Sequence, residues 1–276
     1  MTRQELTDLI ESKQSVLCVG LDPDLQKFPE GVSRDPQGVF NFCQSIIDAT
    51  LPHAVAYKPN FAFFESMGAE GYAVLSDVAD YLHSLEDRPF TIADAKRGDI
   101  GNTAKQYAAG TLGRMGFDSI TVAPYMGEDS VTPFFMEGKW AIPLGLTSNP
   151  GADDLQRLNL EEDGRKVYER VLDLYEEWGR PDQLMVVVGA TRPELLGDIR
   201  KRLPDHFFLV PGVGAQGGTV ADVMTHGAFR DQPGVGTLIN VSRGISFASN
   251  GADYAEVAGH KAAEYHEQMR QNWPKL

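Results

Sequence analysis

Residues 91–100, TIADAKRGDI, place two carboxylates and a lysine at the end of an apolar run. In a β-strand, residues two positions apart project from the same face, so Asp94 and Lys96 are expected to lie side by side. Asp99 follows three residues later, beyond a glycine, where the strand should give way to a helix. Buried charges are costly unless they are paired, and such clusters are more often kept for chemistry than for stability. The stretch therefore predicts a buried strand with a functional site at its C-terminal end.

Apolar runs of strand length recur along the chain, with helical stretches between them. The eight runs cover residues 15–21, 54–58, 90–96, 119–123, 141–147, 184–189, 207–211 and 237–241. Helices are predicted over residues 38–50, 71–85, 102–115, 161–178, 193–203 and 253–269. Alternating strands and helices favour a parallel α/β fold, and eight such units predict a TIM barrel, (β/α)8, formed by one domain over residues 1–276. The functional groups of such a barrel lie at the C-terminal ends of its strands.

Composition excludes several classes of protein. The formal net charge is -14 and there is no long basic run, which argues against a general nucleic-acid-binding surface or attachment to an anionic membrane. Cys18 and Cys43 are the only cysteines and have no metal-like spacing, so neither a disulfide framework nor a structural zinc site is indicated. The N-terminus lacks the apolar segment of a signal peptide, and no apolar run is long enough to span a bilayer. We therefore expect a cytoplasmic protein.

Polar side chains follow most of the predicted strands. If the barrel forms, they converge on one mouth, where acids and lysines from neighbouring strands can satisfy one another without water. The set consists of Asp22, Lys58, Asp94, Lys96, Thr147, Ser148, Gln216 and Arg243.

Simpler structural roles remain open for some of these charged residues. Asp99 could cap the helix that begins near residue 100, because aspartate is a favoured N-cap residue. Asp22 precedes a proline and could be a turn residue. Lys58 and Lys96 could extend from their strand ends into solvent, although the carboxylates near Lys96 make this less favourable there.

A glycine-rich segment, PGVGAQGG at residues 211–218, lies between an apolar strand and a predicted helix. Glycines let backbone N–H groups approach an anion, and the following helix N-terminus adds a favourable dipole. Together with Arg243 the segment predicts a phosphate clamp, because TIM barrels often bind phosphate at the loops after strands seven and eight. A tight structural turn is the alternative. The long segments 22–37 and 148–160 are candidate lids over a ligand.

These motifs together resemble the orotidine 5'-phosphate decarboxylase family. The family's Asp-x-Lys-x-x-Asp signature corresponds to Asp94, Lys96 and Asp99, and Ile100 and Thr103 continue it. PGVGAQGG resembles the phosphate loop, VSRGI at 241–245 the segment with the phosphate-binding arginine, and SNPGA at 148–152 the base-recognition loop. The length of the chain and its TSNPG segment are similar to the longer bacterial-type subgroup, and Asn149 stands where many compact members carry histidine.

The resemblance implies the last step of de novo pyrimidine nucleotide biosynthesis. Orotidine 5'-monophosphate would be converted to uridine 5'-monophosphate (UMP) and carbon dioxide, without a metal or an organic cofactor. It implies a homodimer in which Asp99, Ile100 and Thr103 enter the partner's site. The implied catalytic residues are Lys96, Asp94, Asp99 and Lys58, and the implied substrate-binding residues are Asp22, Ile100, Thr103, Ser148, Gln216, Gly217 and Arg243.

Three other functions are compatible with a barrel that carries such a site. A 3-keto-gulonate 6-phosphate decarboxylase would need a metal to steady an enediolate, and an aldolase would form a Schiff base on Lys96. A barrel that only binds nucleotides would keep the phosphate site without turnover. The complete acid–lysine signature favours catalysis.

Overall fold

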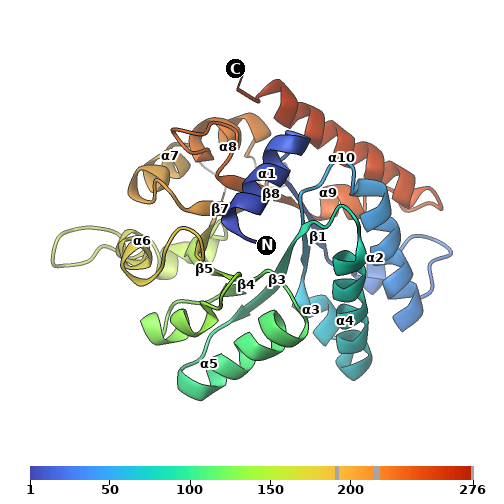
Figure 1. Cartoon of the computed structure of the whole chain (residues 1–276), viewed down its shortest axis with the longest axis horizontal. Helices are drawn as coiled ribbons and strands as arrows, with labels where there is room; N and C mark the ends of the chain where they lie inside the picture. The colour runs from blue at the N-terminus through green and yellow to red at the C-terminus, as the bar shows by residue number, and fades with distance from the viewer. Residues whose placement is uncertain (190–192, 214–217, 275–276) are drawn as a thin grey trace.

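A computed structural model describes residues 1–189, 193–213 and 218–274 of the chain as a closed barrel of eight parallel strands (Figure 1). Each strand pairs with its neighbours in sequence, and β1 also pairs with β8, where Leu17 is opposite Ile239. The predicted fold class is therefore confirmed. The strands are β1 (Leu17–Leu21), β2 (Ala56–Pro59), β3 (Phe90–Arg97), β4 (Ser119–Val122), β5 (Trp140–Leu146), β6 (Met185–Val188), β7 (Phe207–Pro211) and β8 (Thr237–Val241).

Most of the helices cover the outside of the barrel, and a few short helices lie in the loops that follow strands. The α-helices are α1 (Arg3–Lys13), α2 (Pro36–Thr50), α3 (Phe61–Glu65), α4 (Gly68–Ser84), α5 (Gly101–Ala108), α6 (Val167–Trp178), α7 (Pro193–Arg202), α8 (Val220–Gly227), α9 (Arg243–Ser246) and α10 (Tyr254–Gln271). Short 3-10 turns are η1 (Leu25–Lys27), η3 (Glu128–Ser130), η4 (Thr132–Phe134) and η5 (Pro150–Asp154), and η2 (Ala109–Arg114) is a π-helical turn.

Two predicted helices differ from the structure. The helix predicted over 161–178 begins only at Val167, since Gly164 has a φ of 73°, a left-handed conformation that interrupts a helix. The helix predicted over 102–115 is α5 followed by the π-turn η2, which contains two glycines. The short helices α3 and α9 were not expected, because one helical turn has no amphipathic period to detect.

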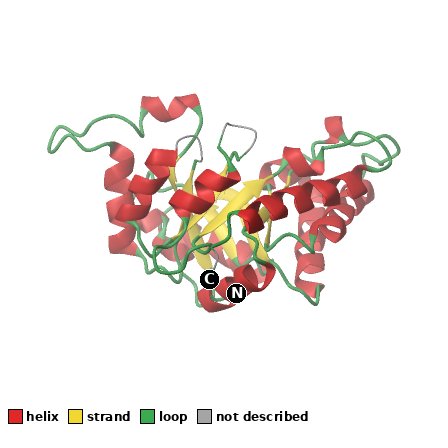
Figure 2. Cartoon of the chain, turned by 90° about the horizontal axis from the view of Figure 1, so that it is seen from above, coloured by secondary structure: helices red, strands yellow, loops and turns green. Residues whose placement is uncertain are grey.

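The N-terminal end of the barrel is closed by α1. Leu6 and Ile10 of this helix are fully buried, and the terminal ammonium of Met1 lies 2.6 Å from the carboxylate of Asp118, just before β4. Arg3 donates hydrogen bonds to main-chain carbonyls that precede β6 and β7. The opposite, C-terminal end carries the longest loops (Figure 2). In the part of the chain that the structure describes, α1 thus covers the N-terminal end of the barrel, and the C-terminal end is the side on which we look for a ligand site.

The side chains inside the barrel change from apolar to charged toward this open end. Cys18, in the middle of β1, is buried against Asn240 of β8, and burial raises the pKa of its thiol to about 12. Cys18 and Cys43 are both free and buried, as expected for small core residues. One layer higher lie Lys58 and Asp94, and these are charged. Within the described residues, no helix is long and apolar enough to cross a membrane.

Candidate active site

The carboxylate of Asp94 lies between two lysines at the open end of the barrel. Its Oδ2 is 2.6 Å from Nζ of Lys58 on β2, and its Oδ1 is 2.5 Å from Nζ of Lys96, two residues further along β3. The side chains of Asp94 and Lys58 are 9% and 7% exposed, whereas that of Lys96 is 53% exposed. The predicted contact between Asp94 and Lys96 is present. The expectation that all three charges are buried is wrong for Lys96, because β3 carries it beyond the rim of the barrel.

Opposite charges dominate the electrostatics of this cluster. Burial by itself would raise the pKa of Asp94, but the ammonium groups of Lys58 and Lys96 outweigh it and hold that pKa well below its usual range. Burial would likewise lower the pKa of Lys58, but the carboxylates of Asp94 and Asp22 raise it. The cluster therefore keeps Asp94 ionised and Lys58 protonated at neutral pH.

Lys96 has an unusual main-chain conformation. Its φ is 47°, in the left-handed region that non-glycine residues rarely adopt and that costs roughly 1–2 kcal/mol. Its N–H donates to the hydroxyl of Thr121 on β4 at 2.9 Å, and the same oxygen lies 3.1 Å from Asp94 Oδ1. Sequence analysis did not single out Thr121, although its spacing from Ser119 on one strand face could have placed it inside the barrel.

Asp22 follows β1 and contacts the opposite side of the barrel seam. The hydroxyl of Ser242, directly after β8, donates to Asp22 Oδ2, while Asp22 Oδ1 is buried and has no partner within the described residues. Gly20 permits this approach, since a Cβ there would lie only 2.7 Å from Cβ of Ser242. Asp22 is thus more than a turn residue: one of its carboxylate oxygens accepts from Ser242, and the other is buried without a partner in the described part of the chain. Ser242 was missed by the sequence analysis.

A cavity of about 240 Å³ lies between the lysine–aspartate cluster and the end of β5, and neither Asp22 nor Ser242 is among the residues that line it. Its polar lining comes from the lysine–aspartate cluster, Thr121 and the segment 147–149, which contains Ser148, and its apolar lining includes Leu144, Val187 and Leu209. Gly189, after β6, lets Ser148 pack closely, because a Cβ there would lie 2.9 Å from that of Ser148. Polar groups thus meet an apolar wall, as in most small-ligand sites.

The segment after β5 is held in place by Gln156. Its side-chain oxygen accepts from the N–H of Thr147 at 2.8 Å, and its side-chain nitrogen donates to the hydroxyl of Thr147 at 2.7 Å. The hydroxyl of Thr147 in turn lies 2.6 Å from Oδ1 of Asn149. No sequence pattern indicated this role for Gln156, since it depends on how the loop folds back.

The predicted phosphate clamp is described only in part. Gly212 has a φ of 89°, and Val213 forms an isolated bridge with Gly218, so the two ends of the glycine-rich segment lie together. Gln216 and Gly217 fall outside the described residues. Arg243 is exposed and begins α9, directly after Ser242. The helix predicted after the segment is present as α8, which begins at Val220.

Asp99, Ile100 and Thr103 do not line the cavity of their own chain. Ile100 and Thr103 are exposed at the start of α5, and Asp99 is half-buried. The alternative in which Asp99 caps this helix is wrong: the N-cap is Ile100, no side chain caps the helix, and the Asp99 carboxylate accepts only from the N–H of Ile100. Asp99, Ile100 and Thr103 therefore lie at the start of α5, outside the cavity of their own chain.

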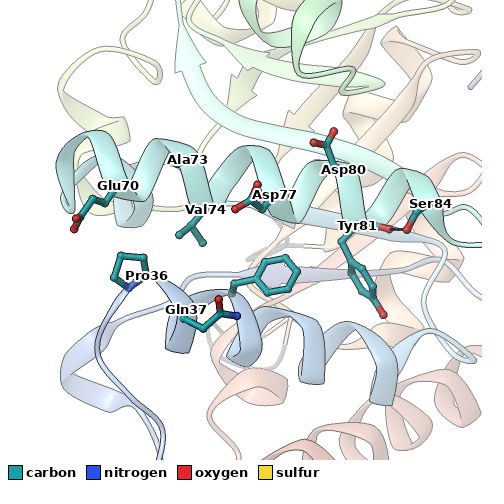
Figure 3. Close-up of a pocket in the computed structure, with 10 residues that line it drawn as sticks. Pro36, Gln37, Glu70, Ala73, Val74, Asp77, Asp80, Tyr81 and Ser84 are labelled. Atoms are coloured by element: carbon teal, nitrogen blue, oxygen red, sulfur yellow. Dashed lines mark hydrogen bonds between the residues drawn. The ribbon is translucent and has the colours of Figure 1, made fainter.

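A larger hollow of about 720 Å³ lies outside the barrel, between α2 and α4 (Figure 3). Glu70, Asp77 and Asp80 project from α4 along it, and none of the residues that line it is a lysine or an arginine. Such a groove would repel an anionic ligand. We take the smaller cavity at the strand ends as the candidate active site, because it contains the lysine–aspartate cluster. Among the described residues, no group of three or more His, Cys, Asp or Glu side chains is arranged to hold a metal ion.

Comparisons with known proteins show which family the chain resembles. The family model described as "Orotidine 5'-phosphate decarboxylase / HUMPS family" matches residues 15–257. The chain is 49% identical over 277 residues to an orotidine 5'-phosphate decarboxylase of Christiangramia forsetii, with 100% of both chains covered. It resembles the solved OMP decarboxylase of Leishmania donovani at 36% identity and a TM-score of 0.80, covering 98% of this chain and 99% of that one. It also resembles the UMP synthase of Leishmania donovani at 38% identity and a TM-score of 0.83, covering 97% of this chain but only 56% of that one.

Proposed function

The chain belongs to the orotidine 5'-phosphate decarboxylase / HUMPS family, and on this basis we propose that it converts orotidine 5'-monophosphate to UMP and carbon dioxide in pyrimidine biosynthesis. The single observation that supports this most directly is the Asp94 carboxylate held between Lys58 and Lys96 at the mouth of the barrel. The proposal covers residues 1–276 as one decarboxylase domain.

The reaction requires stabilisation of a carbanion. When the bond between C6 and the carboxylate breaks, carbon dioxide leaves and the electron pair stays on C6. This pair lies in an orbital orthogonal to the π system of the ring, so the ring cannot delocalise it. The protein must supply a positive charge close to C6 and then a proton.

Lys96 is the residue that we assign to this task. Its ammonium is half exposed at the cavity, in contact with Asp94, and can face a pyrimidine placed against the apolar wall. An ammonium about 3 Å from a carbanion contributes on the order of 5 kcal/mol at an effective dielectric constant near 20. After carbon dioxide leaves, Lys96 transfers a proton to C6 and regains one from solvent. Asp94 orients the ammonium of Lys96.

This charge interaction alone is too small for an enzyme, since typical barrier reductions are about 8–23 kcal/mol. The remainder is assigned to contacts with the unreactive phosphate and ribose, which order the loops and organise the charged cluster. Lys58 and Asp22 would bind the ribose hydroxyls, and one carboxylate oxygen of Asp22 has no partner among the described residues. Ser148 would contact the base. Arg243, Gln216 and Gly217 would hold the phosphate.

We also assign the chain to a homodimer. Four large apolar side chains on α5 and on the segments before it and after β4 are exposed, namely Ile100, Tyr107, Tyr125 and Met126, and we call them the α5 patch. Tyr125 is 83% exposed, and Met126 lies close to Gly98 in the signature segment. A second copy packed on the α5 patch would bury this apolar surface and carry Asp99, Ile100 and Thr103 toward the partner's cavity.

A cytoplasmic location is part of the same proposal. Free buried thiols at Cys18 and Cys43 are compatible with a reducing compartment. Detection of the native protein in the cytoplasmic fraction of its host would support this, and secretion would contradict it.

The proposed activity is tested by the loss of orotidine 5'-monophosphate absorbance in the presence of a metal chelator. The wild-type chain should catalyse it, and Lys96→Ala should lose nearly all turnover. Lys201→Ala, which removes an exposed lysine on α7, is the matched control and should turn over normally. An inactive wild type would overturn the function, whereas a fully active Lys96→Ala variant would overturn only the role of Lys96.

A further inference from the structure

We propose that Thr121 is a positioning residue for the decarboxylation, because its hydroxyl holds both the main chain of Lys96 and the carboxylate that orients the Lys96 ammonium. The inference rests on the proposed function and extends it by one residue, on a strand that the catalytic signature does not include.

The hydroxyl of Thr121 has two short contacts. It accepts a hydrogen bond from the N–H of Lys96 at 2.9 Å, and it lies 3.1 Å from Oδ1 of Asp94, to which it donates. The carbonyl of Ala93 lies further away, at 3.5 Å. Oδ1 is also the oxygen that Lys96 Nζ contacts. The hydroxyl, the carboxylate oxygen and the two ends of Lys96 therefore form one closed hydrogen-bonded ring.

The pairing of β3 with β4 explains why a side chain is needed here. Ala93 is opposite Ile120 and Arg97 is opposite Val122, so Asp94, Ala95 and Lys96 together face the single residue Thr121. The regular ladder is interrupted over this bulge, and the N–H of Lys96 has a side-chain acceptor instead of a main-chain one. The hydroxyl of Thr121 thus serves as the acceptor for Lys96 where the pairing of β3 with β4 is interrupted.

The bulge has a clear consequence for the Lys96 side chain. With a φ of 47°, the main chain of Lys96 turns in the left-handed direction, so its side chain can return toward Asp94 instead of following the strand into solvent. A left-handed lysine persists only where its surroundings hold it. The hydrogen bond from the Lys96 N–H to the Thr121 hydroxyl is one such contact, and it joins Lys96 to β4.

The hydroxyl of Thr121 affects the site strongly because it is buried. Thr121 is 1% exposed and lines the same cavity as Lys58, Asp94 and Lys96. Water cannot easily replace a hydroxyl at such a site, so its removal takes the acceptor from the N–H of Lys96 and one of the two contacts from Asp94 Oδ1. The ammonium then loses its fixed position against C6, while the phosphate and ribose contacts remain. The loss should therefore appear in turnover and not in substrate affinity.

The test compares three variants of the full-length protein with the wild type. Thr121→Val keeps the branched shape and removes the hydroxyl, and Thr121→Ser keeps the hydroxyl. Ser119→Ala is the matched control: it removes another buried hydroxyl from β4, one that donates to the carbonyl of Thr91 and does not line the cavity. Steady-state kinetics with orotidine 5'-monophosphate and UMP binding are measured for each variant, together with thermal unfolding.

In Thr121→Val, kcat should fall about 10- to 100-fold, the value of one or two hydrogen bonds to charged or strained groups. KM and the Kd for UMP should stay within about threefold of the wild type, and Thr121→Ser should recover kcat to within about threefold. If Thr121→Val does not fold, Thr121→Ala provides the variant without a hydroxyl.

Three results would overturn the proposal. One is a Thr121→Val enzyme whose kcat equals that of Ser119→Ala, and another is a Thr121→Ser enzyme as impaired as Thr121→Val. The third is a loss confined to KM. A wild-type chain that does not decarboxylate the substrate would overturn the proposed function first, and the positioning role with it.

Discussion

Lys58 and Lys96 contact opposite oxygens of one carboxylate, that of Asp94, from two neighbouring strands. The distances are 2.6 Å and 2.5 Å, and Asp94 and Lys58 are both buried. A buried ion pair adds little stability compared with apolar packing, but the loss of one partner is costly because it leaves the other charge unpaired. Two ammonium groups around one carboxylate therefore make Asp94 the residue on which the cluster depends.

Asp94→Asn should accordingly reduce both stability and activity. The neutral amide leaves two ammonium groups facing each other, so we expect the free energy of unfolding at pH 7 to fall by about 3 kcal/mol. Decarboxylation should fall by about 10³-fold or more, because Lys96 loses the group that orients it. Urea denaturation and the absorbance assay measure the two effects.

Asp153→Asn is the control, since Asp153 is in an exposed pair with Arg157, and its loss should change stability by less than about 1 kcal/mol. Wild-type behaviour of Asp94→Asn would contradict this account of the cluster.

The barrel itself could be predicted from the sequence, because its strands are short apolar runs bounded by turn residues. The contact between Asp94 and Lys96 was also predicted correctly, although a bulge and a left-handed main chain at Lys96 produce it in place of the regular period of two. The predicted strand limits differ from the structure by one or two residues at several ends, as for β1, which begins at Leu17. A strand ends where its neighbour no longer offers residues for pairing. The local sequence of one strand does not show where this happens.

The contacts that complete the site could not be predicted, because they join residues far apart in the chain. Ser242 reaches Asp22 across the seam between β8 and β1, and this contact exists only once the barrel has closed. The left-handed conformation of Lys96 likewise depends on the register between β3 and β4. The family resemblance supplied roles for individual residues, but not the main-chain geometry that positions them.

His206 makes a specific contribution to acid sensitivity. It is buried, and neither ring nitrogen has a hydrogen-bond partner within the described residues. Burial, with the charges of Arg200 and Arg3 acting in the same direction, lowers the pKa of His206 from its ordinary 6.5 to about 4. The unfolded chain therefore binds more protons than the folded one between these pH values. The stability that neutral His206 provides is complete above pH 6.5 and is lost as the pH falls toward about 4.

The variant His206→Phe keeps a planar ring and removes the titrating group. Between pH 6.5 and pH 4 the wild type should lose on the order of 3 kcal/mol more than the variant. Urea denaturation at several pH values measures this difference. His53 and His83, whose pKa values burial also lowers, stay in both proteins and are common to both curves. Parallel curves for the two proteins would show that His206 does not titrate in this range.

The proposed sharing of sites predicts complementation between two inactive chains. Lys96→Ala removes the proposed proton donor, and Asp99→Ala removes a residue that we assign to the partner's cavity. A heterodimer of the two variants then contains one site with both residues intact and one with neither. Purified heterodimers should recover up to about half of the wild-type activity per dimer, because one of two sites is intact. Verified heterodimers without any recovery would contradict the sharing, and so would an Asp99→Ala homodimer that is fully active.

Arg243 should recognise the phosphate and not the base or the ribose. It is exposed at the start of α9, directly after Ser242, which contacts Asp22. In Arg243→Ala, the Kd for UMP should rise about 10- to 100-fold, the usual value of a charge-assisted contact, while binding of uridine should not change. Turnover of orotidine, which lacks the phosphate, should likewise match that of the wild type.

Arg230→Ala removes another exposed arginine and makes the same change in net charge, so it controls for the general field of an acidic protein. Equal losses for UMP and uridine would mean that Arg243 supports the local structure, whereas a UMP-specific loss in both arginine variants would point to net charge alone.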